Sequence, residues 1–338
     1  MPMVASSLKF GSLHIGPPLF LAPMAGLTHS ALRTLLAVLG GVGLLSTEML
    51  SAARLPAENS RLSPYLLRTE VERPLSYQLL IADERHVAPA LERLHRLGAD
   101  AVDVNLGCPA PRVRRQGGGS MLMEQPEQVR RLVAEIRRRT SLPLSAKIRL
   151  GESLNESGLR NFCRMLEGEG LDLLTVHGRL RGEPFTRSPR WDWIGRVKGW
   201  LSIPVVANGG IDSVDAARRC LEQSGADGLM IGRAAVRTPW LFALIARDVY
   251  GLSLPEPVVR LPLLYREFAD ALADRFPPER RLGRLKEFTH HFARNYFFGH
   301  YLAAAVQASE TLEMARERAE RFFAEHDPAA VQVRTGGL

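Results

Sequence analysis

The first 250 residues alternate short β-rich runs with amphipathic helical patterns, and this alternation restricts the fold more than any other feature. Between the runs lie stretches such as 127–140 and 213–225, and the second begins with Ser213 as a helix N-cap and ends at Gly225. Repeated β/α units of this kind favour an α/β fold, a (β/α)8 TIM barrel, over an open doubly wound sheet. The eight candidate strands cover 19–23, 43–48, 74–80, 101–107, 143–148, 172–178, 203–210 and 228–232.

A Pro-rich break at residues 251–257 separates this pattern from a second region. Beyond it only helical patterns remain, at 261–276, 281–309 and 310–326. A chain of 338 residues exceeds the size at which one core usually stops growing. We therefore predict a barrel domain over 1–250, a small C-terminal helical domain over 257–326, and a flexible tail over 327–338.

Composition excludes several classes of protein. No apolar run approaches the roughly 18 residues that a membrane span needs, and the N-terminus has no charged start leading into an apolar stretch. Three scattered cysteines, Cys108, Cys163 and Cys220, are too few for a disulfide framework or a zinc site. We expect a cytoplasmic monomer without a bound metal, a membrane contact or an obligate protein partner.

Positive charge is unevenly distributed along the chain. The net charge is +8 and the sequence pI is about 9.8. Residues 112–149 carry ten basic groups against three acidic ones, and the run RRLGRLK at 280–286 carries four basic groups and no acidic one. Such clusters predict a polyanionic partner, because each phosphate that is neutralised releases counterions. The alternative is an arginine-rich surface that is merely solvated.

Polar residues and glycines stand where the candidate strands end. In a (β/α)8 barrel the active site is built from the carboxyl ends of the strands, so these positions are expected to meet around one site. A barrel held only by packing would not need hydrogen-bonding groups there. The strand-end positions are Met24, Glu48, Gln78, Asn105, Lys147, His177, Asn208 and Gly232.

The last two strands predict a phosphate site. Gly209, Gly210 and Gly232 allow close backbone approach to an anion, and Arg233 adds a charge that pairs with phosphate. Lys147 is a cation within a strand, which is costly unless it meets an anion or an electron-rich group. Together with the small-residue loop APMAG after the first strand and the amide of Gln78, these features indicate flavin mononucleotide (FMN).

Several motifs then follow in order: APMAGLTHSALRTL, STEML, DVNLGCPAPRVRRQGGGSMLM, AKIRLG, TVHGRLR, VVANGGI and MIGRAAVRTPWLF. Over about residues 17–245 the chain resembles the tRNA-dihydrouridine synthase family. The resemblance implies reduction of the C5=C6 bond of selected tRNA uridines to dihydrouridine, with FMN as cofactor and NADPH as reductant. It also implies that Cys108 protonates C5 while hydride reaches C6.

The resemblance assigns roles residue by residue. Cys108 and Lys147 are the implied catalytic residues. The implied cofactor contacts are Pro23, Met24, Ala25, Gln78, Lys147, His177, Asn208, Gly209, Gly210, Gly232 and Arg233. The expected substrate contacts are Asn105, Arg179, Arg114, Arg115, Arg284 and Lys286. Gly210 departs from the pattern, because many relatives carry aspartate there.

Two other functions compete with this interpretation. One is a barrel flavoprotein that acts on a free pyrimidine such as dihydroorotate, which leaves the basic loop and the helical region without a role. The other is a tRNA-binding protein that has lost catalysis. The presence of Cys108, Lys147 and Gln78 argues against this alternative.

Overall fold

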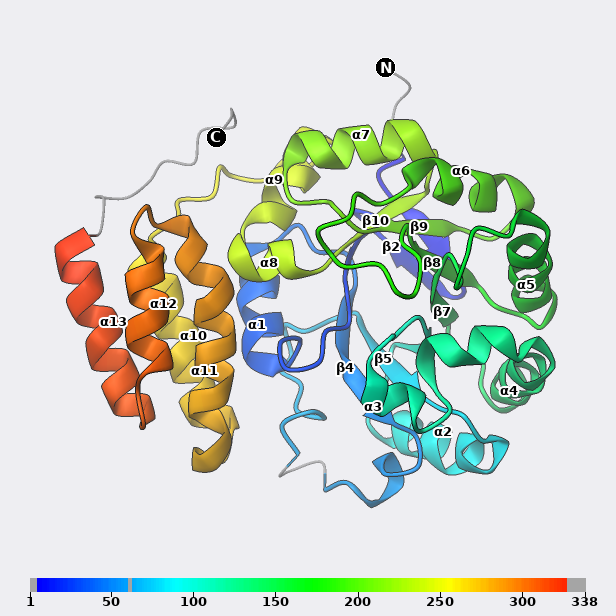
Figure 1. Ribbon diagram of the computed structural model, residues 1–338, viewed down its shortest axis with the longest axis horizontal. Helices are drawn as coiled ribbons and strands as arrows, with labels where there is room; N and C mark the ends of the chain where they lie inside the picture. Colours follow the sequence, from blue (N-terminus) through cyan, green and yellow to red (C-terminus); the bar gives the residue numbers. More distant parts are fainter. Residues whose placement is uncertain (1–4, 60–62, 327–338) are drawn as a thin grey trace.

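The computed structural model describes residues 5–59 and 63–326. Figure 1 shows a ring of parallel strands surrounded by helices, with a bundle of further helices beside it. Eight strands form one parallel sheet in the order β3-β10-β9-β8-β7-β6-β5-β4. A parallel bridge between Phe20 and Leu44, with the Leu21 N–H donating to the Leu44 carbonyl, joins the first strand to the second and closes the barrel. The predicted TIM-barrel fold is confirmed.

Each predicted strand is present, with bounds shifted by a few residues. The strands are β3 (Leu19–Leu21), β4 (Leu45–Ser51), β5 (Leu75–Leu80), β6 (Ala101–Leu106), β7 (Leu144–Arg149), β8 (Leu173–His177), β9 (Val205–Asn208) and β10 (Gly228–Ile231).

Helices follow most strands of the barrel, and α8 and α9 come after the last strand. They are α1 (Ser30–Leu39), α2 (Val87–Arg96), α3 (Pro111–Arg114), α4 (Pro126–Arg139), α5 (Glu156–Gly168), α6 (Trp191–Trp200), α7 (Val214–Ser224), α8 (Arg233–Arg237) and α9 (Leu241–Asp248). Short 3₁₀ turns lie at η1 (Leu55–Ala57), η2 (Glu84–His86) and η3 (Gly119–Glu124).

Helix α7 begins and ends as its sequence predicts. The Ser213 side chain accepts a hydrogen bond from the Ala216 N–H, and Gly225 has φ 58° just beyond the last turn. An N-cap hydroxyl satisfies one of the unpaired amides of the first turn, and glycine adopts the left-handed conformation at little cost. Both end signals are confirmed.

A short hairpin that the sequence analysis missed covers the amino end of the barrel. Strands β1 (Leu8–Phe10) and β2 (Leu13–Ile15) pair antiparallel, and the fully buried Phe10 and Ile15 belong to the same apolar cluster as Phe20 of the barrel. Apolar side chains of the hairpin therefore close the barrel axis at this end, so a ligand that reaches the axis enters from the carboxyl ends of the strands.

Four helices follow the barrel: α10 (Leu261–Arg275), α11 (Pro278–Phe292), α12 (Gly299–Gln307) and α13 (Leu312–His326), with the turn η4 (Ala293–Asn295) between α11 and α12. The pattern expected over 281–309 is thus interrupted at 293–298. Stacked and tilted rings, including those of Tyr265, Phe268 and Phe288, fill the core of the bundle.

The bundle rests directly on the barrel. Helix α10 packs on α1, and the Arg275 guanidinium donates to the hydroxyls of Ser30 (3.0 Å) and Thr34 (2.7 Å). Helix α11 packs on α8. The division into domains over 1–250 and 257–326 stays a prediction, and the tail predicted over 327–338 lies outside the described residues. No helix within the described part of the chain is long and apolar enough to cross a membrane.

Candidate active site

The strand-end residues meet at the carboxyl end of the barrel because neighbouring strands are in register. Gln78 pairs with Asp103, and Asn105 pairs with Lys147 on the next strand. His177 lies between Arg149 on one side and Asn208 on the other. The register therefore brings these predicted site residues to one rim of the barrel.

Asn105 holds the backbone of the cysteine loop. Its Oδ1 accepts hydrogen bonds from the N–H groups of Gly107 (3.3 Å) and Cys108 (3.0 Å), and its Nδ2 donates to Gln78 Oε1 at 2.7 Å. The far end of the loop returns to the same point, where the Ser120 N–H donates to the Cys108 carbonyl at 3.0 Å. Cys108 is thereby fixed at a strand end with its side chain partly exposed.

A buried polar network lies beneath this loop, and Asp103 is its centre. Gln78 Nε2 donates to Asp103 Oδ2 and Ser145 Oγ donates to Asp103 Oδ1, both at 2.6 Å. Burial raises the pKa of Asp103, and the two hydrogen bonds oppose that rise. The sequence analysis did not select Asp103, although an acidic residue within an apolar strand is a usable signal.

Lys147 is a lysine at the strand ends with a strongly shifted pKa. Burial lowers its pKa to about 8, with a second contribution from the Arg149 charge, while Asp103 and Cys108 act in the opposite direction. The register pairs Lys147 with Asn105, and a Cβ added to Gly107 would lie 3.2 Å from the Lys147 carbonyl, so the lysine stands beside the cysteine loop. No carboxylate of the described residues forms an ion pair with Lys147. Its charge is therefore available to a ligand.

His177 and Arg179 form a pair that supports the following loop. The Arg179 guanidinium donates to His177 Nε2 (3.0 Å), to the Arg187 carbonyl (2.5 Å) and to the Phe185 carbonyl (3.0 Å). Burial, followed by the charges of Lys147 and neighbouring arginines, holds the pKa of His177 well below its usual range, so the ring is neutral. Arg179 is thus committed to the loop in this structure, and its contact with substrate stays a prediction.

The same loop carries Phe185 over the rim of the barrel, a residue that the sequence analysis missed. The Arg233 guanidinium carbon lies 3.9 Å from the centre of the Phe185 ring, and that of Arg149 lies 5.6 Å from it. The His177 ring is stacked with Phe185 at 6.1 Å between centroids. The sequence signal that could have identified Phe185 is an aromatic residue within an otherwise polar loop.

The loop after β9 forms a cradle that only glycine fits. A Cβ on Gly209, which has φ 112°, would lie 2.7 Å from His177 Cδ2, and one on Gly210, which has φ 71°, would lie 2.8 Å from Pro189 Cγ. Trp191 Nε1 donates to the Gly209 carbonyl at 3.0 Å, and Asn208 Nδ2 donates to the Met230 carbonyl at 2.8 Å. The loop is therefore packed closely against His177, Pro189 and Trp191, and both positions require glycine.

The loop after the first strand lies beside the last one. A Cβ on Gly232 would meet Met24 Sδ at 3.5 Å, so Met24 and Gly232 are neighbours across the closure of the barrel. The Met24 N–H donates to Thr28 Oγ1 at 3.0 Å, and Gly26 donates to Glu48. Pro23 and Met24 are partly exposed and Ala25 is exposed, so this loop presents a ledge to a ligand.

The predicted tRNA contacts fall into two groups. Arg114 and Arg115 are exposed on and just after the short helix α3, six and seven residues beyond Cys108. Arg284 instead lies against the barrel, with its Nη1 3.6 Å from Glu48 Oε1. Lys286, two residues further along α11, is partly exposed.

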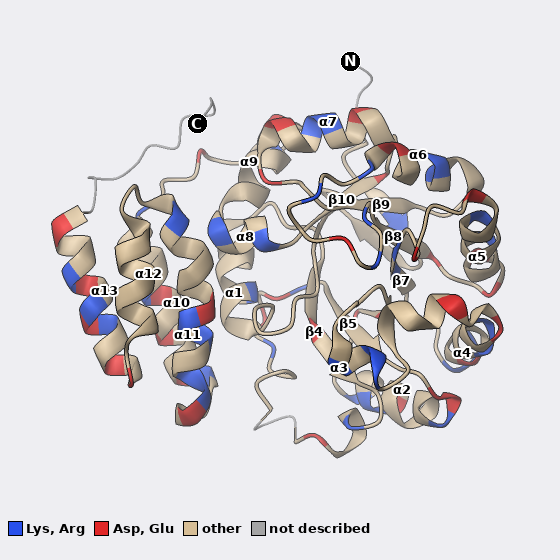
Figure 2. Cartoon of the chain, viewed as in Figure 1, with Lys and Arg blue, Asp and Glu red and all other residues tan. Residues whose placement is uncertain are grey.

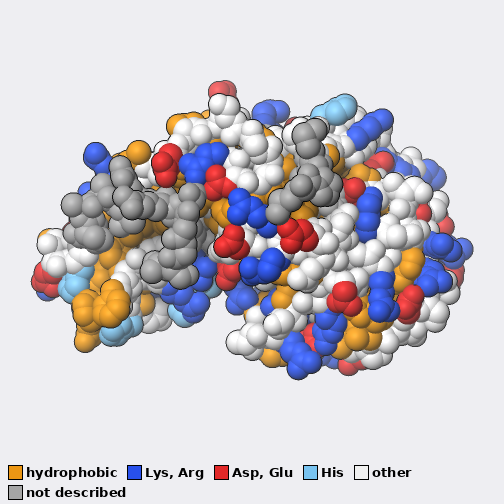
Figure 3. Space-filling model, turned by 90° about the horizontal axis from the view of Figure 1, so that it is seen from above, with side chains coloured by type: hydrophobic (Ala, Val, Ile, Leu, Met, Phe, Trp, Pro, Cys, Tyr) orange, Lys and Arg blue, Asp and Glu red, His pale blue; other side chains and the backbone are white. Residues whose placement is uncertain are grey.

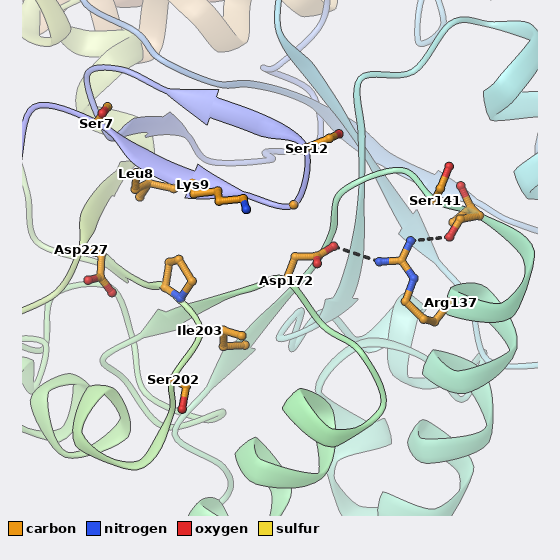
Figure 4. Close-up of a pocket in the computed structure, with 13 residues that line it drawn as sticks. Ser7, Leu8, Lys9, Ser12, Arg137, Ser141, Asp172, Ser202, Ile203 and Asp227 are labelled. Carbon is orange, nitrogen blue, oxygen red and sulfur yellow. Dashed lines mark hydrogen bonds and ion pairs between the residues drawn. The ribbon is translucent and has the colours of Figure 1, made fainter.

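A cavity of about 870 Å³ opens at the opposite end of the barrel, between the β1–β2 hairpin and the starts of strands (Figure 4). Three of its four charged lining residues form ion pairs: Arg137 with Asp172 at 2.9 Å, and Asp227 with Lys198 at 2.7 Å. The Asp172 and Asp227 carboxylates also accept the N–H groups of Leu144 and Val205 at strand starts. These contacts hold the strand starts together. The cavity lies at the opposite end of the barrel from Cys108 and is not part of the candidate active site.

The described residues contain no group of three or more histidine, cysteine or acidic side chains placed to hold a metal ion. The carboxyl end of the barrel instead gathers a thiol, a lysine and arginines, which suits an anionic ligand and proton transfer.

This fold with a strand-end site defines a (β/α)8-barrel enzyme. Among solved structures, the chain is similar in fold to an old yellow enzyme homologue from Zymomonas mobilis, with a TM-score of 0.55, 12% identity, and coverage of 76% of this chain and 95% of the other. It is similar to a dihydroorotate dehydrogenase (DHODH) from Eimeria tenella with a TM-score of 0.52, 15% identity, and coverage of 72% and 83%.

Sequence comparison is more specific. The dihydrouridine synthase (Dus) family model matches residues 20–323. The chain is 32% identical to tRNA-dihydrouridine synthase B of Escherichia coli K12, covering 93% of this chain and all of the relative. It is 36% identical to probable tRNA-dihydrouridine synthase 1 of Synechocystis sp., covering 70% of this chain and 66% of the relative. The chain belongs to the dihydrouridine synthase family, an oxidoreductase family, and the resemblance seen in its motifs is confirmed.

Proposed function

We propose that this enzyme reduces the C5=C6 bond of uridines in tRNA to 5,6-dihydrouridine, with FMN as cofactor and NADPH as reductant. The observation that carries the proposal is the placement of Cys108, which Asn105 fixes at a strand end beside Lys147. Family membership supports the reaction, and the names of the relatives support tRNA as the substrate.

The residues present fit FMN. Gly209 and Gly210 both have positive φ and form a loop of backbone groups without side chains, which suits close approach of a phosphate. Among the described residues, no carboxylate forms an ion pair with Lys147, Arg149 or Arg233, so their charges call for an anion. The residues proposed to hold FMN are Pro23, Met24, Ala25, Gln78, Lys147, His177, Asn208, Gly209, Gly210, Gly232 and Arg233.

FMN, when bound, supplies hydride chemistry that protein side chains lack. The protein's own task is to deliver a proton to uracil C5 as C6 gains hydride, and we assign this to the Cys108 thiol. A cysteine thiol is mostly protonated at neutral pH and releases a proton readily. Asn105 positions Cys108 through the loop backbone, and Lys147, which pairs with Asn105 on the neighbouring strand, is assigned to the reactive end of the cofactor.

A uridine stacked within folded tRNA must turn outward to reach this site. Folded RNA is recognised through shape and phosphates, which dispersed cations serve well. Arg114 and Arg115 stand beside the cysteine loop and are proposed to guide the RNA backbone, with Lys286 and Arg284 on α11 and Arg179 near the rim as further contacts. Such a reaction belongs in the cytoplasm, where tRNA is processed and free thiols persist.

The test is product formation on defined substrates. Protein reconstituted with FMN and given NADPH should convert uridine to dihydrouridine in an unmodified tRNA transcript, measured by mass spectrometry of the digested nucleosides. Free uridine and dihydroorotate, given at the same concentration, should remain unchanged. Turnover of a free pyrimidine without turnover of tRNA would overturn the proposal in favour of a small-molecule flavoprotein.

A further inference from the structure

Three aromatic side chains form an exposed ridge on the helical bundle. Phe297, Phe298 and Tyr301 are 92%, 44% and 59% exposed, and we call them the aromatic ridge. The rings touch in sequence, with centroids 4.8 Å apart for Phe297 and Phe298 and 6.2 Å apart for Phe298 and Tyr301. Figure 3 shows hydrophobic side chains gathered beside histidines at the helical end of the molecule.

Packing of the bundle does not account for the ridge. The same segment supplies its core from other residues, since Phe292, Tyr296 and Leu302 are buried. Tyr296 packs edge-on against Phe322 at 5.2 Å. Burying a phenylalanine ring is strongly favourable. The almost fully exposed Phe297 therefore offers apolar surface that a ligand can bury on binding.

The segment that carries the ridge contacts the barrel beside the candidate active site, through η4 and α8. Asn295, two residues before Phe297, donates from its side chain to the Arg237 carbonyl on α8, the helix that carries Arg233. Arg294, one residue before Asn295, is exposed on the same turn η4. Figure 2 shows basic residues on α8 where the bundle approaches the barrel.

We propose that the aromatic ridge is a stacking platform for unpaired nucleobases of the tRNA whose uridine is reduced at the barrel. This inference rests on the proposed function and specifies its partner contact. Aromatic rings stack on the face of any base, and neighbouring cations meet the phosphates between bases. Arg294, three residues before Phe297, is exposed and supplies such a cation, and His290 and His300 are exposed nearby in the sequence.

The experiment measures tRNA affinity at several salt concentrations for Phe297→Ala and Tyr301→Ala. Each should weaken binding about 5-fold or more, because stacking on one ring contributes about 1–3 kcal/mol. The salt dependence should stay as in the wild type, since no charge is lost. Arg294→Ala should instead lower the slope of log affinity against log salt by about 1. Phe297→Trp should retain wild-type affinity.

Matched controls are Val258→Ala and Leu263→Ala, which remove other exposed hydrophobic side chains (74% and 45%) and should leave tRNA affinity unchanged. If the wild type forms dihydrouridine in tRNA and the ridge variants bind tRNA equally well, the platform is wrong and the function stands. If the ridge variants alter only self-association in sedimentation, the ridge is a contact between copies. A wild type that binds no tRNA overturns both proposals.

Discussion

The Arg284 guanidinium of α11 lies 3.6 Å from the carboxylate of Glu48 at the end of the second barrel strand. The other Glu48 oxygen accepts the Gly26 N–H at 2.7 Å, next to the proposed FMN ledge at Pro23–Ala25. Burial raises the pKa of Glu48, and the Arg284 charge opposes that rise. The helical bundle therefore contacts the first-strand loop through a carboxylate that is 4% exposed.

Removing the arginine should loosen this loop. Arg284→Met leaves a buried carboxylate without its cation, so we expect the free energy of unfolding to fall by about 2 kcal/mol and FMN affinity to fall with it. Urea denaturation and FMN titration measure the two effects. Arg280→Met, which removes an exposed arginine from the same helix, is the control and should change neither. If the two variants have the same free energy of unfolding and the same FMN affinity, the contact between Arg284 and Glu48 contributes to neither.

Lys147 should make stability depend on pH. Its pKa is about 8 in the folded protein against an ordinary 10.5, so the unfolded chain binds its proton more tightly. The free energy of unfolding should therefore rise as pH increases from about 8 to 10.5, as far as this group is concerned. Lys147→Met removes the penalty, and the FMN-free variant should exceed the FMN-free wild type by about 1–3 kcal/mol at pH 7, with the difference shrinking by pH 10. Parallel profiles would contradict the shifted pKa.

Gly210 occupies a backbone position that does not suit the aspartate of many relatives. It has φ 71°, and a Cβ added there would lie 2.8 Å from Pro189 Cγ. Gly210→Asp should therefore strain the loop and lower Tm, at a cost of about 1–3 kcal/mol. Gly168→Ala, at a helical position with open space around the new Cβ, should not lower Tm. A Gly210→Asp protein as stable as wild type, with tighter FMN binding, would mean that the loop adapts.

The basic helix α3 should govern the ionic part of tRNA binding. Arg114→Ala with Arg115→Ala should weaken binding and reduce the salt slope by about 2, because each lost phosphate contact accounts for about 1. FMN binding, which these exposed residues do not support, serves as the internal control. An unchanged slope would remove both arginines from the RNA path.

The barrel was predictable from sequence because short β-rich runs alternate with helical patterns, and a polar residue or glycine stands at or just after the end of most of these runs. The hairpin β1–β2 was not, because its two short strands precede the repeating β/α pattern and no helical pattern lies between them. The pattern over 281–309 suggested one continuous stretch, whereas η4 interrupts it and turns Phe297 to the surface. Periodicity identifies apolar residues without saying which of them the tertiary packing buries.

The candidate site likewise contains residues that the sequence identifies and contacts that only the tertiary structure shows. Gln78, Asn105 and Lys147 were selectable because polar groups at strand ends converge in this fold. That Asn105 holds the Cys108 amide, or that Arg284 turns toward Glu48, depends on how loops and the bundle return to the barrel. The contact between Arg284 and Glu48 joins residues far apart in sequence, so a local pattern does not encode it.

The most direct test of the account is a single-turnover reaction of Cys108→Ala with tRNA. The variant should bind FMN and accept electrons from NADPH at the wild-type rate, while dihydrouridine formation falls by at least about 100-fold, because the proton donor to C5 is gone. Cys220→Ala, at a buried helical cysteine outside the site, should keep wild-type turnover. Dihydrouridine formation by Cys108→Ala at the wild-type rate would contradict the central claim.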